Sequence, residues 1–499
     1  MTRFPRSIVI AGGGTAGWLA ALLLAGAARD RGAELDLTVI ESSAIGSVGV
    51  GEGTTAVFRM MLKKLGLDEA EFLRETGATI KYGIRHRDWR RLGHHYDGPI
   101  DDPSQLGMSG LDLYAVSAGK PASDAHLFQH LMNRRKSPYA LKGERHVPAG
   151  PFHHAFHFDQ ARAAVYLRSK ADGVTVIDDR IVSVETAAEG DISALMLESG
   201  QRIAADFFVD CTGFARALIG ELGAKWVGYG DTLPVNRAMP FWIDLAEGEE
   251  IDPLTLAWAQ KNGWMWKIPT QERYGCGYVY SDAHISPDEA KAEIETALGH
   301  RIEPRNDIRI NAGRLDKGWI GNCAALGLSS SFLEPLEATS IHGTIVQLLM
   351  LSQWLPDPDG PAKYNSAVAT QVDDFRDFIR THYISERRDS AFWCDVAATH
   401  PQPVLDRVAA WRHRLPQRSD FPPFPGDLPH VQQQLYTPVL DGLGLLDRAS
   451  AKAELAAHPA RRAQLRKTYD NLCKEYRQAA LRCMPHRSFL QSLQKEKVA

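Results

Sequence analysis

The chain has 499 residues, 44% of them hydrophobic and 24% charged, which is a globular composition with enough length for two domains. Its formal net charge of -4 excludes a protein-wide basic field for nucleic acid or an anionic membrane, so a small-molecule partner is the simpler expectation. With no charged-then-apolar leader and no long apolar run, the sequence predicts a soluble, cytoplasmic protein.

The first predicted elements are a strand, a glycine-rich turn and a helix. Residues 7–11 form a short apolar run, and residues 18–28 are rich in alanine and leucine, as in a buried helix. Residues 35–40 predict the next strand, which ends at Glu41. This order is a βαβ unit of the kind that binds dinucleotides.

The turn of this unit has the pattern Gly-x-Gly-x-x-Gly. Gly12 permits the tight turn, Gly14 lets the backbone approach a pyrophosphate, and Gly17 permits close packing of helix on strand. The phosphates would meet the positive end of the helix, and Glu41 could accept hydrogen bonds from ribose hydroxyls. The predicted cofactor residues of the unit are Gly12, Gly14, Thr15, Ala16, Gly17 and Glu41.

Three later segments offer more backbone to an extended cofactor. Residues 48–55 form a second glycine-rich loop, for which a flexible connection is the alternative interpretation, and turns occur at residues 210–213 and 321–324. Dispersed contacts of this kind suit FAD. The FAD-binding domain is therefore predicted to be discontinuous, with residues 1–90, 150–230 and 305–350.

The other segments predict a second sheet and a helical end. Alternation over residues 238–244 and 274–280 predicts strands of a mixed-sheet substrate domain, assigned to residues 91–149 and 231–304. Helices are expected at 341–354, 364–382 and 461–481, so residues 351–499 form a mostly helical C-terminal region with a proline-rich linker or lid loop at 421–425. The fold class is α/β with a Rossmann-type domain.

The six cysteines are scattered and form neither a Cys-x-x-Cys pair nor a ligand cluster with histidine. We expect free thiols and no bound zinc or other metal. These cysteines are Cys211, Cys276, Cys323, Cys394, Cys473 and Cys483.

Six further motifs carry a family resemblance. They are Val50-Gly51-Glu52-Gly53-Thr54-Thr55, Thr79-Ile80-Lys81, His157-Phe158-Asp159, Asp210-Cys211-Thr212-Gly213-Phe214, Trp264-Met265-Trp266-Lys267-Ile268-Pro269 and Glu334-Pro335-Leu336-Glu337-Ala338-Thr339-Ser340. With the glycine-rich turn, they resemble the flavin-dependent tryptophan halogenase family from the first strand to about Trp393. Asn322 follows Gly321 where a related flavin hydroxylase more usually carries aspartate, which favours a halogenase.

The resemblance implies a flavin monooxygenase-like fold that binds FAD, with Val50, Gly51, Glu52 and Gly327 among the cofactor residues. Reduced flavin (FADH2) would come from a separate NAD(P)H-dependent flavin reductase. With O2 it would oxidise bromide or chloride to hypohalous acid. The partners implied are therefore this reductase and a small aromatic substrate, and a homodimer is compatible with the sequence.

The resemblance also implies how the halogen reaches the substrate. Hypohalous acid would pass through a tunnel to Lys81, which either hydrogen-bonds it or forms a haloamine. Glu337 would stabilise the cationic ring or remove its proton. The tunnel wall would include Trp264, Trp266 and Pro269.

Structural interpretations of these residues remain open from the sequence. Alternation around Lys81 predicts a side chain that faces water on a half-buried strand. Glu337 could stabilise the dipole of the helix that begins near Ile341, a role compatible with catalysis. Trp264 and Trp266 could be core residues on one face of a strand.

A halide site is predicted at the start of the same helix. Backbone N–H groups of Thr339 and Ser340 would be free there. Tryptophan halogenases tend to have serine in place of Ala338 and glycine in place of Ser340, and glycine permits backbone conformations that serine resists. The hypothesis from this departure is a preference for bromide, which is larger and more easily oxidised, over chloride.

The substrate is predicted to be a neutral indole, another electron-rich aromatic or a peptide-borne tryptophan. Residues 419–445 lack the tyrosine- and glutamate-rich lid that grips free tryptophan in the family, and Tyr436 is their single tyrosine. A zwitterion would lose hydration there without compensation. The aromatic site is expected to draw on His95, Phe392 and Trp393.

Three other functions are less consistent with the sequence. An aromatic hydroxylase would use the same reduced flavin and oxygen, but Lys81 and the tryptophan run weigh against it. A flavin-binding sensor would not need Lys81 and Glu337. A flavoenzyme that oxidises NADH alone is disfavoured because the chain has no second dinucleotide loop.

Overall fold

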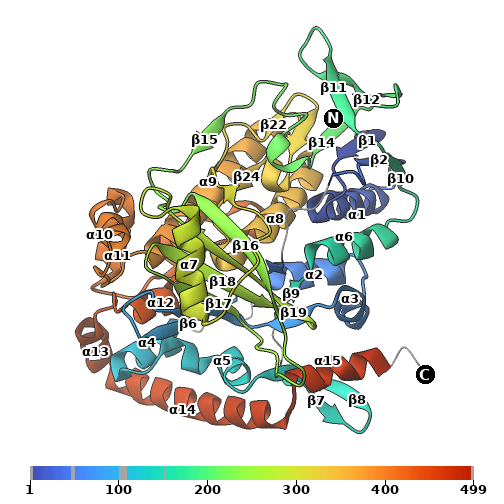
Figure 1. Ribbon diagram of the computed structural model, residues 1–499. Coiled ribbons are helices and arrows are strands. Elements are labelled where there is room, and N and C mark those ends of the chain that lie inside the picture. The colour runs from blue at the N-terminus through green and yellow to red at the C-terminus, as the bar shows by residue number, and fades with distance from the viewer. Residues whose placement is uncertain (1–3, 46–50, 101–108, 151–152, 496–499) are drawn as a thin grey trace.

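The computed structural model describes residues 4–45, 51–100, 109–150 and 153–495. The first strand of the chain lies within a six-stranded sheet (Figure 1). The strand order is β10-β2-β1-β14-β23-β22, and every pair is parallel except β22 with β23. Its strands are β1 (Ser7–Ala11), β2 (Asp36–Glu41), β10 (Thr175–Asp178), β14 (Phe207–Asp210), β22 (Trp319–Ile320) and β23 (Cys323–Ala325). Strands from distant parts of the chain thus join one sheet, which confirms the expected discontinuous Rossmann-type fold.

Helix α1 (Thr15–Asp30) follows the glycine-rich turn and packs against α6 (Gln160–Ser169) and α8 (Thr339–Trp354). Its buried side, which includes Trp18, Leu19 and Leu23, faces the core, because apolar residues recur with the helical period. The expected helix at 18–28 is therefore present and extends a few residues further at each end.

A seven-stranded mixed sheet forms the second layer of strands, in the order β20-β16-β19-β18-β17-β5-β6. All its pairs are antiparallel except β5 with β17. The strands are β5 (Gly83–Arg87), β6 (His95–Pro99), β16 (Arg237–Asp244), β17 (Thr255–Ala259), β18 (Gly263–Pro269), β19 (Arg273–Tyr280) and β20 (Ile308–Arg309). Helix α7 (Pro287–Leu298) covers one face (Figure 1). The division of the chain into domains stays a prediction. Strand β5 belongs to the range 1–90, which was assigned to the FAD-binding domain, but it pairs within this second sheet.

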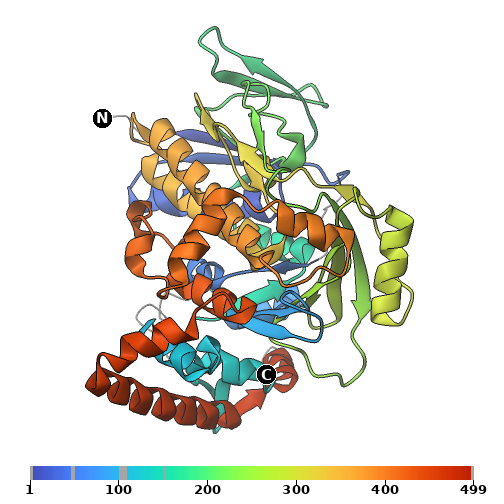
Figure 2. The ribbon, with the colours of Figure 1, turned by 90° about the vertical axis from the view of Figure 1, so that its left-hand side faces the viewer.

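The C-terminal region is helical, as the periodicity predicted. Its helices are α9 (Gly360–His382), α10 (Ala391–Ala398), α11 (Gln402–Trp411), α12 (Gln433–Leu443), α13 (Arg448–Ala456), α14 (Pro459–Arg482) and α15 (His486–Lys495). The long helix α14 packs beneath α4 (Ser109–Ala118) and α5 (Leu127–Met132), so that the end of the chain contacts its first third (Figure 2). Among the described residues, no helix combines the length and apolar character needed to cross a bilayer.

The described residues also form four three-stranded sheets, two short α-helices and several 3-10 turns. The sheets are β3 (Glu52–Gly53), β9 (Ala155–Phe158) and β4 (Thr79–Lys81); β11 (Ile181–Thr186), β12 (Ile192–Leu197) and β13 (Arg202–Ile203); β15 (Trp226–Gly228), β21 (Gly313–Leu315) and β24 (Ser331–Phe332); and β25 (Cys483–Pro485), β7 (Lys136–Lys142) and β8 (Arg145–Pro148). Helices α2 (Ala56–Lys64) and α3 (Glu69–Thr76) lie between β3 and β4 in the chain. Strand β4 ends at Lys81 and β5 begins at Gly83, so Lys81 lies where the chain passes between two sheets.

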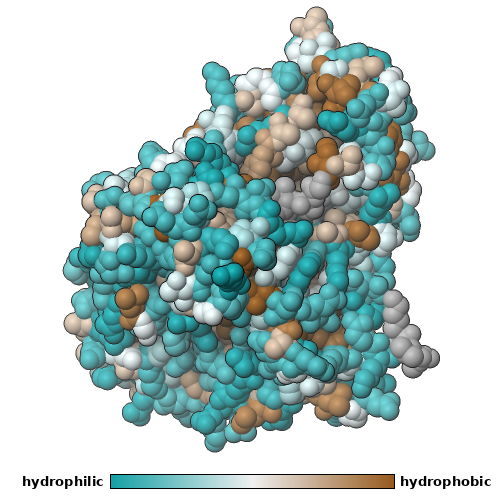
Figure 3. All heavy atoms as spheres, viewed as in Figure 1, coloured by the Kyte–Doolittle hydropathy of each residue, from teal (hydrophilic) through white to brown (hydrophobic). Residues whose placement is uncertain are grey.

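Polar residues dominate the face of the molecule seen in Figure 3, with apolar residues scattered among them, as the charged composition predicts. All six cysteines have free thiols, which confirms that prediction.

Candidate active site

The glycine-rich turn brings backbone atoms too close for side chains. Gly12 has φ of 109°, and a Cβ there would lie 2.3 Å from the carbonyl oxygen of Cys211. A Cβ at Gly17 would lie 1.9 Å from the carbonyl oxygen of Gly12. Gly14 is exposed, and no atom lies within 4 Å of a Cβ built on it. The turn is therefore packed tightly on its inner side and open on the side where a pyrophosphate would approach.

Substituting Gly17 with alanine should destabilise the FAD-binding sheet by about 3 kcal/mol, because the new methyl group meets backbone that cannot move aside. Thermal unfolding and FAD titration should show a lower Tm and weakened FAD binding. Gly26→Ala is the matched control, because Gly26 lies in the same helix with no atom within 4 Å of its Cβ position. This control should be neutral or slightly stabilising, and an equal loss in both variants would contradict the packing argument.

Other predicted cofactor residues gather around the turn. The Glu41 carboxylate lies beside Gly13, where a Cβ would meet its Oε2 at 1.8 Å, and it pairs with Arg168. Gly327 has φ of 60°, and a Cβ there would lie 3.0 Å from the Cβ of Ala16. The hydroxyl of Thr15 is buried without a hydrogen-bond partner. The turn is open and carries hydrogen-bond donors at the start of α1, which fits an extended dinucleotide such as FAD.

The second glycine-rich loop lies further along, near Lys81. Val50 lies outside the described residues, so its predicted contact stays a prediction. Gly51 has φ of 135°, and a Cβ there would lie 3.5 Å from the Cα of Gly275. Burial raises the pKa of Glu52 to about 7, although the charge of Lys81 opposes this shift. The loop thus connects the region of the predicted cofactor site to Lys81.

Lys81 is buried, with 1% of its surface exposed, so the interpretation that it faces water on a half-buried strand is wrong. Its Nζ would lie 3.1 Å from a Cβ on Gly53, and Thr255 and Ala338 surround the same position. Burial lowers the pKa of Lys81 to about 8, although the charges of Glu337 and Glu52 oppose the shift. Lys81 therefore remains mostly protonated at neutral pH and can release its proton slightly above it.

Glu337 lies in a strained turn immediately before α8. Glu337 and Ala338 have φ of 67° and 54°, values that cost non-glycine residues about 1 kcal/mol each. The Oε1 atom of Glu337 lies 3.1 Å from Nε2 of His86 and 3.3 Å from Nε2 of His382. Burial raises the pKa of Glu337, but contacts with His86, His382 and Lys81 outweigh it and the pKa lies below its usual value. Glu337 is thus a charged carboxylate in a buried site.

Lys81 and Glu337 line one pocket, which holds about 440 Å³ of space free of protein atoms, part of it open to solvent. Most of its other walls are apolar. The described residues that line it are Thr54, Thr55, Lys81, Ile84, Pro99, Ile100, Glu337, Thr339, His342, Phe375, Phe378, His430, Val431 and Leu435. Burial lowers the pKa of His342 to about 4, so its imidazole is neutral. Lys81 and Glu337 are the charged groups that an aromatic ring would meet among these residues.

The tryptophan run of β18 lies in the core. Trp264 and Trp266 are buried with their ring centroids 6.4 Å apart, and Trp264 Nε1 donates a hydrogen bond of 2.7 Å to Glu334. Glu334 also accepts one of 2.6 Å from the hydroxyl of Tyr383. The run therefore supports the turn that carries Glu337. Neither tryptophan lines the pocket described above, and their part in a tunnel wall stays a prediction.

The structure does not bring the other predicted aromatic-site residues to this pocket, which corrects their expected placement. His95 is exposed on β6, because strand alternation buries its neighbour Tyr96 instead. Trp393 is buried and its Nε1 donates to the carbonyl of Gln260 at 2.8 Å. Phe392 packs against His284, and the carbonyl of Pro269 accepts a 2.7 Å hydrogen bond from Thr79.

The predicted halide residues begin α8. Ala338 precedes Thr339 and Ser340, and no side chain caps the helix, so N–H groups of its first turn are free for an anion. The left-handed backbone falls on Glu337 and Ala338, whereas Ser340 has helical backbone. Serine at this position therefore carries none of the strain that we expected from the missing glycine.

Sequence reasoning missed two histidines and most of the apolar wall. His86 and His382 contact Glu337 from β5 and α9, but each occurs alone in the sequence with no recognisable motif. His430, Val431 and Leu435 come from the segment 419–445, where the sequence showed only the missing polar lid. Tyr436 points elsewhere and accepts a 3.1 Å hydrogen bond from Arg407. Val431 precedes α12 and Leu435 lies in its first turn, so the two share no single period that the sequence could have shown.

The fold combines a mostly parallel sheet, which carries the dinucleotide turn, with an adjoining mixed sheet. Together with a pocket that contains a buried lysine and a glutamate, these features are those of a flavin-dependent enzyme. Comparison with known proteins identifies the family. A tryptophan halogenase family model matches residues 7–456, and the chain belongs to this family.

The chain is 34% identical to a tryptophan 6-halogenase from Streptomyces toxytricini over 495 residues, which covers 92% of this chain and 93% of the relative. It is also 34% identical to a tryptophan 7-halogenase from Lentzea aerocolonigenes, covering 77% and 78% of the two chains. A flavin-dependent halogenase from Xanthomonas campestris superposes with a TM-score of 0.84 at 34% identity, covering 98% of each chain. The protein is a flavin-dependent halogenase of an aromatic substrate that needs a separate flavin reductase, and the hydroxylase is not favoured.

Proposed function

We propose that this halogenase transfers electrophilic halogen to a neutral, electron-rich aromatic ring such as indole, between Lys81 and Glu337. The apolar pocket that contains these two charged groups carries the proposal. Bound reduced FAD, with oxygen, supplies the oxidising equivalent that converts halide to hypohalous acid. The remaining steps rest on the side chains and backbone of this chain.

Each group of the pocket has a distinct task in this proposal. Backbone N–H groups of Thr339 and Ser340 bind the halide at the positive end of α8. The Lys81 ammonium, which is buried and has three donors, holds hypohalous acid or is itself halogenated. Glu337 stabilises the cationic ring and removes the proton from the carbon that has gained halogen. The surrounding apolar residues exclude water, which would otherwise compete for the halogen.

Bromide is proposed as the preferred halide. The backbone at Ser340 gives no support for this preference, because it is helical and unstrained. The proposal therefore rests on the easier oxidation of bromide and not on the geometry of the anion site.

The test is mass spectrometry of indole incubated with the protein, FAD, NADH, an unrelated flavin reductase and oxygen, in equimolar bromide and chloride. We expect monobrominated indole as the main product, recognised by its bromine isotope doublet, and no product without halide. An excess of the chlorinated product would reject the bromide preference alone. A singly oxygenated product that forms without halide would reject halogenation itself and support a hydroxylase.

A further inference from the structure

Two buried imidazoles flank the proposed catalytic carboxylate. His86 and His382 are both fully buried, and their Nε2 atoms lie 3.1 Å and 3.3 Å from the same oxygen of Glu337. Their rings are stacked, with centroids 4.6 Å apart and planes 24° from parallel. The ring of His86 also stacks on that of Tyr96, with centroids 4.6 Å apart. One oxygen of Glu337 therefore faces two ring nitrogens from different elements.

The two histidines are held independently of Glu337. The hydroxyl of Tyr96 lies 2.9 Å from Nδ1 of His382. When the tyrosine donates to Nδ1, the proton of the neutral imidazole is on Nε2, the nitrogen that faces Glu337. The ring of His86 stacks on that of Tyr96 and on that of His382, whose centroids lie 6.4 Å apart, and these two contacts restrict its rotation. Neither ring can turn far without breaking these contacts.

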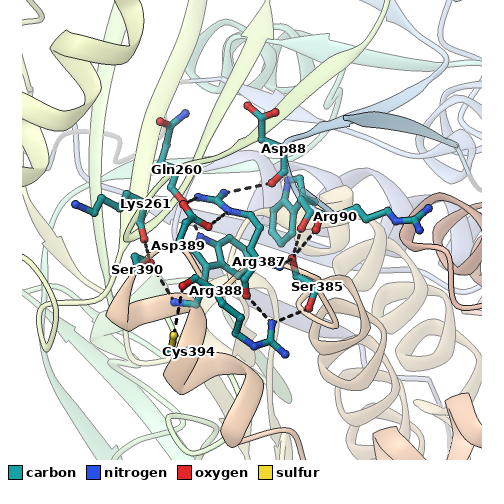
Figure 4. A network of polar contacts seen from close by, with 12 residues as sticks. Asp88, Arg90, Gln260, Lys261, Ser385, Arg387, Arg388, Asp389, Ser390 and Cys394 are labelled. Atoms are coloured by element: carbon teal, nitrogen blue, oxygen red, sulfur yellow. Dashed lines mark hydrogen bonds and ion pairs between the residues drawn. The ribbon is translucent and has the colours of Figure 1, made fainter. Parts of the chain in front are cut away.

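The chain immediately after His382 is also fixed. Arg387 donates two hydrogen bonds of 2.8 Å to the carboxylate of Asp389 and one of 3.2 Å to the carbonyl of Asp88 (Figure 4). Ser390 donates to the carbonyl of Lys261 at 2.6 Å. This network connects the end of α9 to the chain beyond β5, the strand that carries His86, so the two histidines keep their spacing.

We propose that His86 and His382 are positioning residues, whose ring nitrogens keep the Glu337 carboxylate charged and directed into the pocket. The inference rests on the catalytic role proposed for Glu337 and deepens it. Both histidines act through Glu337 and line no part of the pocket among the described residues.

Two neighbouring buried carboxyl groups show what Glu337 would do without them. Burial raises the pKa of Glu52 and that of Glu334 to about 7, and Glu334 keeps this value in spite of two hydrogen bonds. Glu337, which is also buried, has a pKa below the usual value. Lys81 acts on both Glu52 and Glu337, so the groups that distinguish the surroundings of Glu337 are His86 from β5 and His382 from α9.

His382 does this without adding charge at neutral pH. Burial lowers the pKa of His382 to about 3, so its ring is neutral and presents an N–H dipole. Tyr96 stacks on His86 and its hydroxyl contacts His382. His342 and His430 line other parts of the pocket, and His430 pairs with Asp374. A neutral donor stabilises the carboxylate less than a cation would, and so leaves it basic enough to accept a proton from the ring.

Metal binding is the competing interpretation, because the three ligand atoms lie within 4.8 Å of one another. A metal ion lies in the plane of each imidazole that binds it. Two stacked rings with nearly parallel planes cannot both satisfy this condition for one ion. The stacking therefore favours the positioning role.

The test measures the pH dependence of single-turnover indole halogenation in His382→Leu and His382→Gln. Loss of the polar ring nitrogen that lies 3.3 Å from the carboxylate should raise the pKa of Glu337. Because the reaction needs the carboxylate, activity is present above that pKa and is lost as pH falls through it. The acid limb of the pH–activity curve, where activity falls at low pH, should therefore move to a pH about 1–2 units higher in the leucine variant. Glutamine, which restores an N–H donor, should return most of the shift.

Tyr96→Phe and His342→Gln complete the series. The phenylalanine keeps the stacked ring and removes only the hydroxyl bound to His382, so a smaller shift in the same direction is expected. His342→Gln removes a histidine of the same pocket that does not contact Glu337, so the acid limb should stay in place whatever the rate. A uniform loss of rate in the His382 variants with no movement of the limb would overturn the proposal.

A readout without turnover separates this inference from the proposed function. The carboxyl band of Glu337 in the infrared spectrum, assigned by its loss in Glu337→Gln, should protonate at higher pH in His382→Leu than in the wild type. This shift would stand even if indole were not halogenated, in which case only the proposed function fails. The same titration pH in both proteins, or stoichiometric zinc bound to the purified wild type and lost in the variant, would reject the positioning role.

Discussion

Replacing Lys81 with methionine is expected to abolish halogenation while reduced flavin is still oxidised. Methionine fills a similar buried volume and removes the ammonium, so the pocket should stay folded and lose the group that holds the electrophilic halogen. We expect a fall in halogenated product of at least about 1000-fold. The measurement is product by mass spectrometry beside oxygen consumption, which should persist with release of unused oxidant.

Lys170→Met is the matched control, because Lys170 is partly exposed and pairs with Glu71 away from the pocket. It should halogenate at the wild-type rate, and full activity of Lys81→Met would remove Lys81 from the mechanism. The pH dependence of the wild type separates the two proposed tasks of Lys81, whose pKa lies at about 8. Activity that rises as pH passes this value favours a haloamine formed by the free amine, whereas activity that falls favours hydrogen bonding by the ammonium.

The burial of Lys81 shows where sequence reasoning reached its limit. Alternation along residues 78–84 predicted a water-facing lysine. The pattern of one strand shows which residues share a face, but it does not show whether other parts of the chain cover that face. In the fold, residues near Gly53, Thr255 and Ala338 close over Lys81. These contacts come from three distant parts of the chain, and no local pattern encodes them.

The glycine-rich turn is the opposite case. Gly12 has the positive φ of a tight turn and Gly17 packs on Gly12 and Ile10, as the motif predicted, because the contacts of Gly17 lie within a few residues of it. The contact of Gly12 with Cys211 is the part that only the whole fold decides. The long helices α8, α9 and α14 were also predicted within a few residues, since their period repeats over several turns. Site residues outside motifs, such as His86 and His382, depend on packing between β5 and α9 and could not be predicted.

The second large effect concerns the substrate. Indole should be halogenated with a kcat/KM about 1000-fold higher than that of free L-tryptophan. Apart from Lys81 and Glu337, the described residues that line the pocket include no carboxylate, lysine or arginine, so a zwitterion meets no further opposite charge among them. Removing water from either charge without replacement costs several kcal/mol, and about 4 kcal/mol corresponds to a factor of about 1000.

N-acetyl-L-tryptophan amide separates charge from size in this comparison, because it carries the bulk of tryptophan without its charges. If desolvation of charge causes the discrimination, the amide should be a much better substrate than free tryptophan. If both are equally poor, the pocket excludes bulk, and the argument from charge is wrong. Tryptophan within about tenfold of indole would mean that the enzyme supplies partners for the zwitterion.

The same reasoning explains why Lys81 and Glu337 do not serve as those partners. Each is already engaged by opposite charge or by ring nitrogens, since the charges of Lys81 and Glu337 stabilise one another and Glu337 also faces His86 and His382. An amino acid that bound to either would occupy the group needed for halogen transfer or proton removal. A neutral ring leaves both free, so the arrangement that makes the pocket reactive also selects against a charged substrate.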